Sequence, residues 1–444
     1  MPRLSPPNRA RLELVRAVGG ALVSPLRYLA HVPGRSRAMA RIAEDVAEAD
    51  GAIDPTPALD LPADRPLRIF VSAAEASGEI HAATLVRELR RLAEEHGAPP
   101  PEITAVGGDR LRALGLDPVA DPVARAHMGF DGVAQSLPYY VGVLRDAGAH
   151  ADAFRPDVFV PVDSPALHVP MARVVRASRT PVVHLVTPQY WGWAPWRVGG
   201  YRRAVDVGLS ILPHEPRWFR RNGVETRHVG HPLLDVLEDV PSTRPDPTSS
   251  TLAILPGSRA GVIRRNLPWM LEALGPLRAA HPGADVAVLQ STDEHAELVQ
   301  GIAEGSGARL VVGDLHAQLA AARAAFAVSG TVLTDVLHHR LPTVVLYRIS
   351  KRFEAWAYRH VLTCPYFAST NLLAGEELLP EHCFRGDGPG DEIAAQVLRA
   401  YGDEAYRSRL APALDRAAER LGPPGAVARA AAHALAVATE HPRR

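Results

Sequence analysis

Short apolar runs alternate with helical patterns along most of this chain. In its first half the runs predict β-strands at residues 67–73, 103–106, 157–162, 182–186 and 207–212. In its second half they predict strands at 252–255, 285–289, 309–312, 325–328 and 343–347. Intervening segments such as 79–96 carry apolar residues at helical spacing and stop at a glycine, here Gly97. Val- and Ile-rich strands that alternate with helices predict parallel sheets covered by helices on both faces.

One segment interrupts this alternation. Residues 238–250 (EDVPSTRPDPTSS) are rich in Pro, Ser, Thr and charge, which is typical of a linker. We therefore predict an α/β protein with two Rossmann-like, doubly wound parallel-sheet domains, at residues 67–240 and 241–444. Ligands of such sheets bind at the carboxyl ends of the strands, so we expect the two domains to face each other across a cleft. The last helices are expected to pack back on the first domain.

Residues 1–66 follow a different pattern. Eight arginines lie between residues 1 and 41 against one acid, Glu13, and apolar residues are interleaved with them. A basic amphipathic segment of this kind can lie on an anionic membrane surface. Its prolines favour instead a partly disordered extension. The weakly apolar stretch 17–23 is short for a signal peptide and lacks a cleavage site. We predict a basic extension, partly disordered or associated with a membrane surface.

Composition narrows the class of protein. The chain has 444 residues, 47% hydrophobic and 22% charged, with a formal net charge of zero. These values are typical of a globular protein, and nothing global indicates nucleic-acid binding. Two isolated cysteines, Cys364 and Cys383, argue against a disulfide framework and a zinc site. We therefore expect a protein of the reducing cytoplasm, without a metal. No uninterrupted apolar stretch is long enough to span a bilayer.

Two strand ends in the second half run into small residues followed by a helix. Such loops leave backbone N–H groups unpaired, and together with the helix dipole they favour a phosphate group. Two of them beside an arginine indicate a bound pyrophosphate, through Gly257, Ser258, Arg259, Ser329, Gly330 and Thr331. The ordinary alternatives are a helix-capping turn and, for Arg259, a surface ion pair.

The first half offers an acid at a corresponding place. Asp163 follows a predicted strand and would point into the cleft, where a carboxylate could take a proton from a sugar hydroxyl. Helix capping is the alternative role for Asp163. The loop after the first strand adds Glu75, Ser77 and Gly78. Glu75 could orient the acceptor or the base, or could simply stabilise the first turn of a helix.

Eight segments together carry a family resemblance. They are AEASGEIHAA (74–83), AVGGDRL (105–111), DVFVPVDSP (157–165), TPQYWGWAPWRV (187–198), VGHPLLD (229–235), LPGSR (255–259), VSGT (328–331) and STNLLAG (369–375). In this order they resemble the lipid-A-disaccharide synthase family, a family of glycosyltransferases with the GT-B fold. The resemblance implies transfer of 2,3-diacylglucosamine from UDP to 2,3-diacylglucosamine 1-phosphate (lipid X). The products are a β-1,6 disaccharide and UDP, formed with inversion and without a metal or other cofactor.

The resemblance also assigns roles to residues. It makes Asp163 the essential aspartate that acts as the base, Arg259 a functional arginine and Asn371 an active-site amide. It places Asp335 where the family usually carries a glutamate that binds ribose hydroxyls. Tyr347 and Arg348, at the end of the strand that precedes Asn371, are further candidates for substrate contact.

After Asp163 the chain departs from the family pattern. Ala166, Leu167 and His168 stand where the family tends to carry Asp-Phe-Asn. His168 could replace the usual polar group, or it could mark a different acceptor.

The resemblance implies a UDP-sugar donor, a lipid acceptor and peripheral association with the cytoplasmic face of the inner membrane. Exchange of C-terminal segments would give a homodimer. The segment 127–146, with Met128, Phe130, Tyr139 and Tyr140, corresponds to an apolar membrane-facing patch, or alternatively to core. The tryptophans at 191, 193 and 196 suit a sugar, a lipid interface or a core.

Two other functions stay open at this point. One is another GT-B enzyme, such as a UDP-GlcNAc 2-epimerase or a transferase with a different acceptor. The other is a catalytically weak paralogue that binds a nucleotide sugar or a lipid, which Ala166, His168 and Asp335 would suit.

Overall fold

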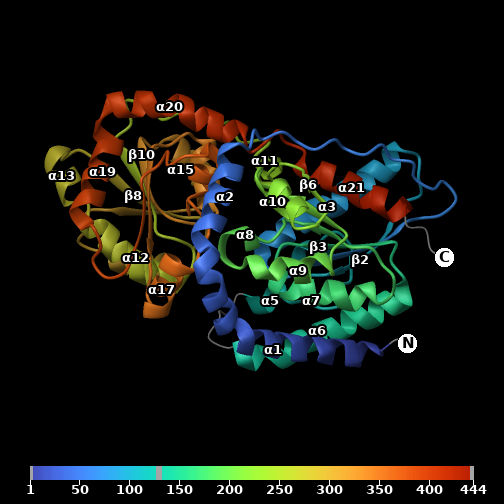
Figure 1. The fold of residues 1–444 in the computed structure, drawn as a ribbon. Coiled ribbons are helices and arrows are strands. Elements are labelled where there is room, and N and C mark those ends of the chain that lie inside the picture. Colours follow the sequence, from blue (N-terminus) through green and yellow to red (C-terminus); the bar gives the residue numbers. More distant parts are fainter. Residues whose placement is uncertain (1–3, 127–132, 441–444) are drawn as a thin grey trace. The chain divides into compact units, whose positions relative to one another are not determined.

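Two six-stranded sheets form the framework of the protein (Figure 1). The computed structural model describes residues 4–126 and 133–440. The chain divides into two compact units. Unit 1 takes the described residues of 1–34, 51–235 and 422–444, and unit 2 takes 35–50 and 236–421.

The sheet of unit 1 has the strand order β2-β1-β3-β4-β5-β6, with every neighbouring pair parallel. Its strands are β1 (Arg68–Ala73), β2 (Glu102–Val106), β3 (Val158–Val162), β4 (Val183–Leu185), β5 (Val207–Ser210) and β6 (Thr226–His228). Strands β1 to β5 confirm the five predicted for this half, whereas β6 was not predicted. The central strand β3 is buried along its whole length, as expected where helices cover both faces.

Helices cover this sheet and a C-terminal helix completes its core. They are α3 (Ala76–Glu95), α4 (Asp109–Arg112), α5 (Val123–Ala126), α6 (Val133–Phe154), α7 (Pro165–Arg176), α8 (Tyr190–Trp193), α9 (Val198–Arg202), α10 (Glu215–Arg221), α11 (Leu233–Val236) and α21 (Ala426–Glu440). Helix α21 packs on α3 and contributes Val427, Leu435 and neighbouring alanines to the core. The carboxylate of Asp235 accepts hydrogen bonds from the backbone N–H groups of residues 425, 426 and 427, which caps α21.

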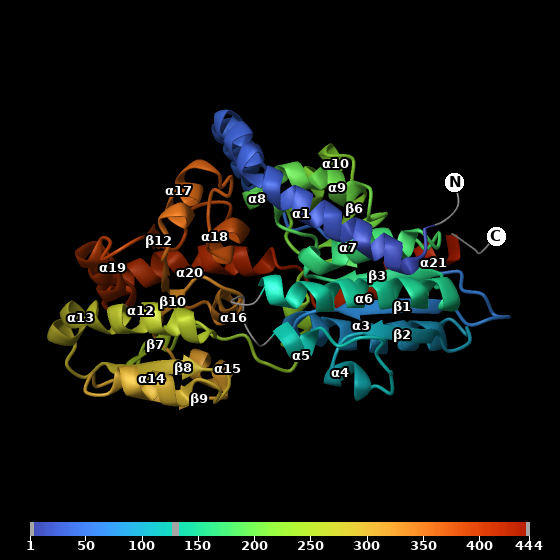
Figure 2. The same cartoon turned by 90° about the horizontal axis from the view of Figure 1, so that it is seen from below.

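The N-terminal segment is helical. Helix α1 (Pro6–His31) lies along α6 in unit 1, as Figures 1 and 2 both show, and also contacts α7. A short 3₁₀ turn, η1 (Val32–Gly34), leads to α2 (Arg35–Ala47), which belongs to unit 2 and contacts α18 (Ser369–Ala374). The structure thus builds residues 6–31 into one unit and 35–47 into the other. A membrane-surface role for this segment stays a prediction.

The sheet of unit 2 has the order β12-β11-β10-β7-β8-β9, again with parallel neighbours. Its strands are β7 (Thr251–Leu255), β8 (Asp285–Gln290), β9 (Arg309–Val312), β10 (Ala324–Val328), β11 (Thr343–Arg348) and β12 (Glu381–Phe384). All five predicted strands are confirmed, and β12 is additional. The remaining helices are α12 (Ala260–Glu272), α13 (Gly275–Ala280), α14 (Ala296–Ala303), α15 (Leu315–Ala320), α16 (Val332–His338), α17 (Arg352–His360), α19 (Gly390–Gly402) and α20 (Glu404–Glu419).

Each sheet has one point at which the strand order reverses. In unit 1 it lies between β1 and β3, and in unit 2 between β7 and β10. Loops that leave neighbouring strands in opposite directions open a crevice there, where doubly wound folds bind their ligands. The loops after these four strands hold most of the residues predicted for the site. Within the described part of the chain, no helix is both long and apolar enough to cross a membrane.

Candidate functional site

Asp163 follows β3 in an uncommon backbone conformation. Both Asp163 (φ 55°) and Ser164 (φ 44°) are left-handed, and Ser164 precedes the first residue of α7. A non-glycine residue in this region costs about 1–2 kcal/mol, so the surroundings must hold it. The N–H of Asp163 donates to the carbonyl of Leu185 at 2.8 Å.

Two histidines hold the Asp163 carbonyl. Its oxygen lies 2.6 Å from Nδ1 of His168 and 3.0 Å from Nε2 of His184. Because a carbonyl oxygen only accepts, both imidazole nitrogens must carry protons and donate them. This requirement assigns the tautomer of each ring.

The other nitrogen of each ring accepts a hydrogen bond from a hydroxyl group. Ser72 Oγ lies 2.9 Å from Nε2 of His168, and the Tyr201 hydroxyl lies 3.0 Å from Nδ1 of His184. Both histidines are buried, and burial is the main cause that lowers the pKa of His168 to about 3 and that of His184 to about 4. Both rings are therefore neutral at physiological pH. The departure at His168 has a structural role: this side chain fixes the backbone of Asp163.

The side chain of Asp163 lies close to the first loop of unit 1. Ser164 Oγ donates to Oε1 of Glu75 at 3.3 Å, and a β-carbon at Gly78 would lie 3.9 Å from the β-carbon of Asp163. Burial raises the pKa of Asp163, and the negative charge of Glu75 raises it further. A carboxyl group with a raised pKa is suited to accept a proton. Ser77, in the first turn of α3, is exposed beside them.

In unit 2 the loop after β7 depends on a glycine. Gly257 has φ +102°, and a β-carbon there would come within 2.7 Å of Val262 Cγ1. Gln290 Nε2 donates to the Gly257 carbonyl at 3.3 Å. Ser258 and Arg259 are exposed, and Arg259 immediately precedes α12. Over residues 4–126 and 133–440, the Arg259 guanidinium has no hydrogen bond or ion pair, so it is available to a ligand.

The loop after β10 is anchored at one end and open at the other. Ser329 donates its N–H to Leu346 at 3.0 Å and its hydroxyl to the Phe367 carbonyl at 2.9 Å. Gly330 and Thr331 are exposed, and a β-carbon at Gly330 would meet no atom within 4 Å. At the start of α16, Leu333 and Thr334 donate their N–H groups to the carbonyls of Gly330 and Thr331 at 3.2 and 3.0 Å, whereas within the described residues the N–H groups of Gly330 and Thr331 themselves make no backbone hydrogen bond. The backbone here is therefore suited to an anion.

Asp335, one turn into α16, is half-buried. Its Oδ1 lies 3.6 Å from Nε2 of His316, and burial raises the pKa of Asp335 to about 7. His316 Nδ1 in turn lies 3.1 Å from Nε2 of His339. The sequence did not single out this histidine partner, because His316 follows a different strand and only the fold brings it to α16.

Asn371 is buried, and both the nitrogen and the oxygen of its side-chain amide are hydrogen-bonded within the protein. Its Nδ2 donates to the Leu379 carbonyl at 2.8 Å and to Oε2 of Glu381 at 3.1 Å. Its Oδ1 accepts from the N–H groups of Leu378 and Leu379 at 3.0 and 2.8 Å. These bonds fasten α18 to the start of β12. Burial raises the pKa of Glu381 to about 7. The catalytic role of Asn371 stays a prediction.

Arg348 and Tyr347 lie at the end of β11. Arg348 donates to the carbonyls of Arg265 and Gly386, and it lines a cavity of about 300 Å³ together with Arg265 and Arg385. Tyr347 is 41% exposed. The substrate contacts predicted for both residues stay predictions.

Trp191 and Trp196, two of the tryptophans in segment 187–198, have different surroundings. Trp191 is buried in unit 1, and its Nε1 donates to Oε1 of Glu215 at 3.1 Å, so it is a core residue. Trp196 instead contacts the end of α1, with its ring centroid 4.9 Å from that of Tyr28. Met128 and Phe130, two of the residues expected in an apolar patch, lie outside the described residues.

Comparison with known proteins decides the family. A profile of the family described as lipid-A-disaccharide synthetase matches residues 69–408. The lipid-A-disaccharide synthase of Myxococcus xanthus (strain DK1622) is 36% identical over 386 residues, covering 83% of this chain and 97% of that protein. Its counterpart from Syntrophus aciditrophicus (strain SB) is 31% identical, with the same coverage. This chain belongs to the lipid-A-disaccharide synthetase family.

Solved structures confirm the fold. The S. aureus MnaA–UDP co-structure superposes with a TM-score of 0.54 at 12% identity, covering 81% of this chain and 94% of that one. The glycosyltransferase SnogD from Streptomyces nogalater gives 0.51 at 18% identity, covering 84% and 100%. At these identities the likeness shows the fold alone, and it confirms the predicted GT-B architecture. The family confirms the enzyme class and reaction: a UDP-dependent glycosyltransferase of lipid A biosynthesis.

Proposed function

We propose that this member of the lipid-A-disaccharide synthetase family uses Asp163 as the general base that deprotonates the 6-hydroxyl of the lipid acceptor. The observation that carries the proposal is the position of Asp163. It lies at the crevice of unit 1, with its strained backbone held by two neutral histidines. Strain of this kind persists where a site requires one geometry.

The reaction requires one base, which takes the proton of the acceptor, and one cationic group, which offsets the charge on the leaving UDP. The acceptor 6-oxygen attacks the anomeric carbon of the donor from the face opposite UDP, and its proton passes to the Asp163 carboxylate. The bond between the anomeric carbon and the phosphate oxygen breaks, and its electron pair leaves with UDP. Attack opposite the leaving group inverts the anomeric centre, through an oxocarbenium-like transition state.

For the donor, we propose binding at the crevice of unit 2. The exposed backbone of Gly330 and Thr331 would hold the pyrophosphate, with Gly257, Ser258 and Ser329 shaping the two loops. The guanidinium of Arg259 would offset the charge that develops on the departing UDP. The Asp335 carboxylate would accept hydrogen bonds from the ribose hydroxyls.

On the acceptor side, we propose that Glu75 and Ser77 position the sugar near Asp163. Gly78 lets α3 pass close to the end of β3, since a β-carbon there would lie 3.4 Å from the Val162 carbonyl oxygen. Asn371 would keep the segment between α18 and β12 in place. Tyr347 and Arg348 would contact substrate at the end of β11. The acyl chains of the substrates favour action at the cytoplasmic face of the inner membrane, and a homodimer is part of the same proposal.

Product analysis tests the proposed function. Purified protein is incubated with UDP-2,3-diacylglucosamine and lipid X, and the products are identified by mass spectrometry. We expect the β-1,6 disaccharide and UDP in equal amounts. Tight binding of UDP without turnover would instead indicate a weak paralogue, and conversion of UDP-GlcNAc alone would indicate an epimerase.

A further inference from the structure

Helix α1 exposes a row of large apolar side chains. Seven lie along it: Leu12, Val15, Val18, Leu22, Val23, Leu26 and Leu29. Leu22 is 76% exposed, and Val15 and Leu26 are each 66% exposed. At about 3.6 residues per turn, residues 15, 18, 22, 26 and 29 share one side of the helix. The row is therefore a continuous stripe.

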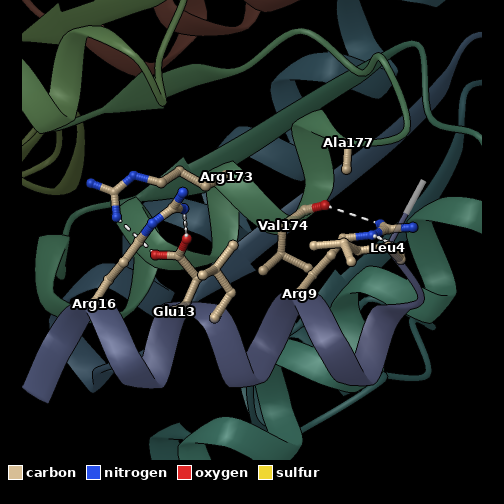
Figure 3. A pocket seen from close by; sticks show the side chains of 8 residues that line it. Leu4, Arg9, Glu13, Arg16, Arg173, Val174 and Ala177 are labelled. Atoms are coloured by element: carbon tan, nitrogen blue, oxygen red, sulfur yellow. Dashed lines mark hydrogen bonds and ion pairs between the residues drawn. The ribbon is translucent and has the colours of Figure 1, made fainter. Parts of the chain in front are cut away.

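In the N-terminal part of α1, the side opposite the stripe carries charged residues that face the protein. Arg9 and Glu13 are buried there; Arg9 pairs with Asp152 and donates to the Val174 carbonyl at 3.2 Å. Glu13 pairs with Arg173 at 2.8 Å, as Figure 3 shows. A surface helix normally buries its apolar side and exposes its polar side. Here the polarity is reversed, and the buried ion pairs fix the apolar stripe outward.

The far end of α1 is also held. Tyr28 and His31 make edge contacts with Trp196, with ring centroids 4.9 and 5.3 Å apart. Contacts at both ends prevent the helix from rotating to bury its apolar stripe. A contiguous exposed apolar patch of this kind marks an interaction surface.

The charges beside the stripe indicate its partner. Arg11, Arg16 and Arg27 are exposed on α1. The single acid of the helix, Glu13, is buried and paired with Arg16 and Arg173. Exposed charge on α1 is thus entirely positive. A bilayer with anionic headgroups complements both features, because leucines and valines enter the acyl boundary while arginines stay at phosphate level.

We propose that the apolar stripe of α1, residues 12–29, docks this protein on an anionic lipid bilayer, with the helix lying in the plane of the interface. The helix precedes residues 69–408, which the family profile matches, so this surface is an addition to the shared enzyme. The docking proposal rests on the proposed function in one respect only. If the acceptor is a lipid, docking brings the enzyme to the bilayer that contains its substrate.

Vesicle sedimentation tests the docking. The full-length protein is mixed with phosphatidylethanolamine vesicles that contain a minor fraction of phosphatidylglycerol. We expect wild type to bind them, and Leu22→Ser/Leu26→Ser to lower the partition coefficient on the order of tenfold or more. Arg11→Gln/Arg27→Gln should weaken binding to anionic vesicles and leave binding to pure phosphatidylcholine unchanged. The matched control is Val236→Ser/Val312→Ser, two apolar residues that are 47% and 41% exposed outside α1.

Three results would overturn the docking proposal: wild type that does not bind vesicles, serine variants that bind like wild type, or a vesicle-free dimer that Leu22→Ser/Leu26→Ser dissociates. The last result would assign the stripe to a second copy of the chain. Turnover with detergent-dispersed substrates separates this proposal from the proposed function. The Leu22→Ser/Leu26→Ser variant should keep the wild-type rate there, whereas failure of the enzymatic function would abolish turnover in wild type and leave vesicle binding intact.

Discussion

The Nδ1–H group of His168 donates to the main-chain carbonyl of Asp163 over 2.6 Å. This bond joins the residue that departs from the family pattern to the residue proposed as the base. His184 donates to the same oxygen, so two fixed, neutral rings set the direction in which the Asp163 side chain leaves the backbone. We propose that His168 and His184 position Asp163 for the reaction.

Replacing His184 by Phe tests this positioning role. The variant removes one donor to the Asp163 carbonyl and leaves the Tyr201 hydroxyl without its acceptor. We expect kcat to fall about 10- to 100-fold, because a small misplacement of a catalytic group is costly. The KM for the UDP-sugar should change little, since the donor loops belong to unit 2. His168→Asn, which keeps an N–H donor, should retain more activity than His168→Ala. Equal rates for these two variants would contradict the role.

Arg259→Ala should weaken UDP binding about 10- to 100-fold, the range expected for loss of a hydrogen-bonded charge on phosphate. Isothermal titration calorimetry with UDP measures this directly. Arg264→Ala is the control, because Arg264 is also exposed and lies on the following helix, α12. If both variants bind UDP equally well, Arg259 does not contact the pyrophosphate.

Gly257→Ala should destabilise the loop after β7, whereas Gly261→Ala should not. At Gly257 the backbone is left-handed and the added methyl group would collide with Val262, at 2.7 Å. At Gly261, in the first turn of α12, a β-carbon meets nothing within 4 Å. We expect Gly257→Ala to lose UDP affinity and to unfold at lower temperature. Alanine at 261 should be neutral or slightly stabilising, because alanine favours helices. The same UDP affinity for both variants would argue against the predicted loop function.

Glu215 should make the stability of the protein depend on pH. It is buried, and burial raises its pKa from 4.5 to about 7 although Trp191 and Thr187 donate to it. Because its pKa is higher in the folded state, Glu215 binds a proton more tightly in the folded than in the unfolded protein. The free energy of unfolding that protonated Glu215 contributes is therefore lost as the pH rises from about 4.5 to about 7. Its size is on the order of 3 kcal/mol.

Urea unfolding at about pH 5 and about pH 8 measures the Glu215 contribution. Glu215→Gln should shrink the difference in free energy of unfolding between the two conditions. The exposed residue Glu304 supplies the control, Glu304→Gln, which should leave the difference as in wild type. An unchanged difference in Glu215→Gln would show that another group dominates.

The sequence predicted the strands that coincide with apolar runs and missed those that do not. Ten strands follow such runs and all ten are present. The two unpredicted strands lie at sheet edges. Strand β6 (Thr226–His228) contains no large apolar residue, and β12 (Glu381–Phe384) is only half-buried, with Glu381 and His382 in it. Edge strands pair through their backbone alone, so their side chains need not show a pattern.

For the candidate site, the sequence indicates residues that are close along the chain, but not contacts between residues on different strands. Small residues after β7 and β10 predict a phosphate loop without any tertiary information, and that role stays a prediction. The contacts of Asp163 with His184 and of Asp335 with His316 depend on which strands are neighbours. A histidine inside the apolar run 182–186 was the available signal, since a buried polar group requires a partner. The identity of that partner came only from the sheet order.

The most direct measurement is the turnover of Asp163→Asn with UDP-2,3-diacylglucosamine and lipid X, together with its affinity for UDP. Asparagine keeps the size of the side chain and cannot accept the proton, so kcat should fall by about 10²-fold or more while the Kd for UDP stays within about twofold of wild type. A variant that turns over at near wild-type rates would contradict the assignment of Asp163 as the base.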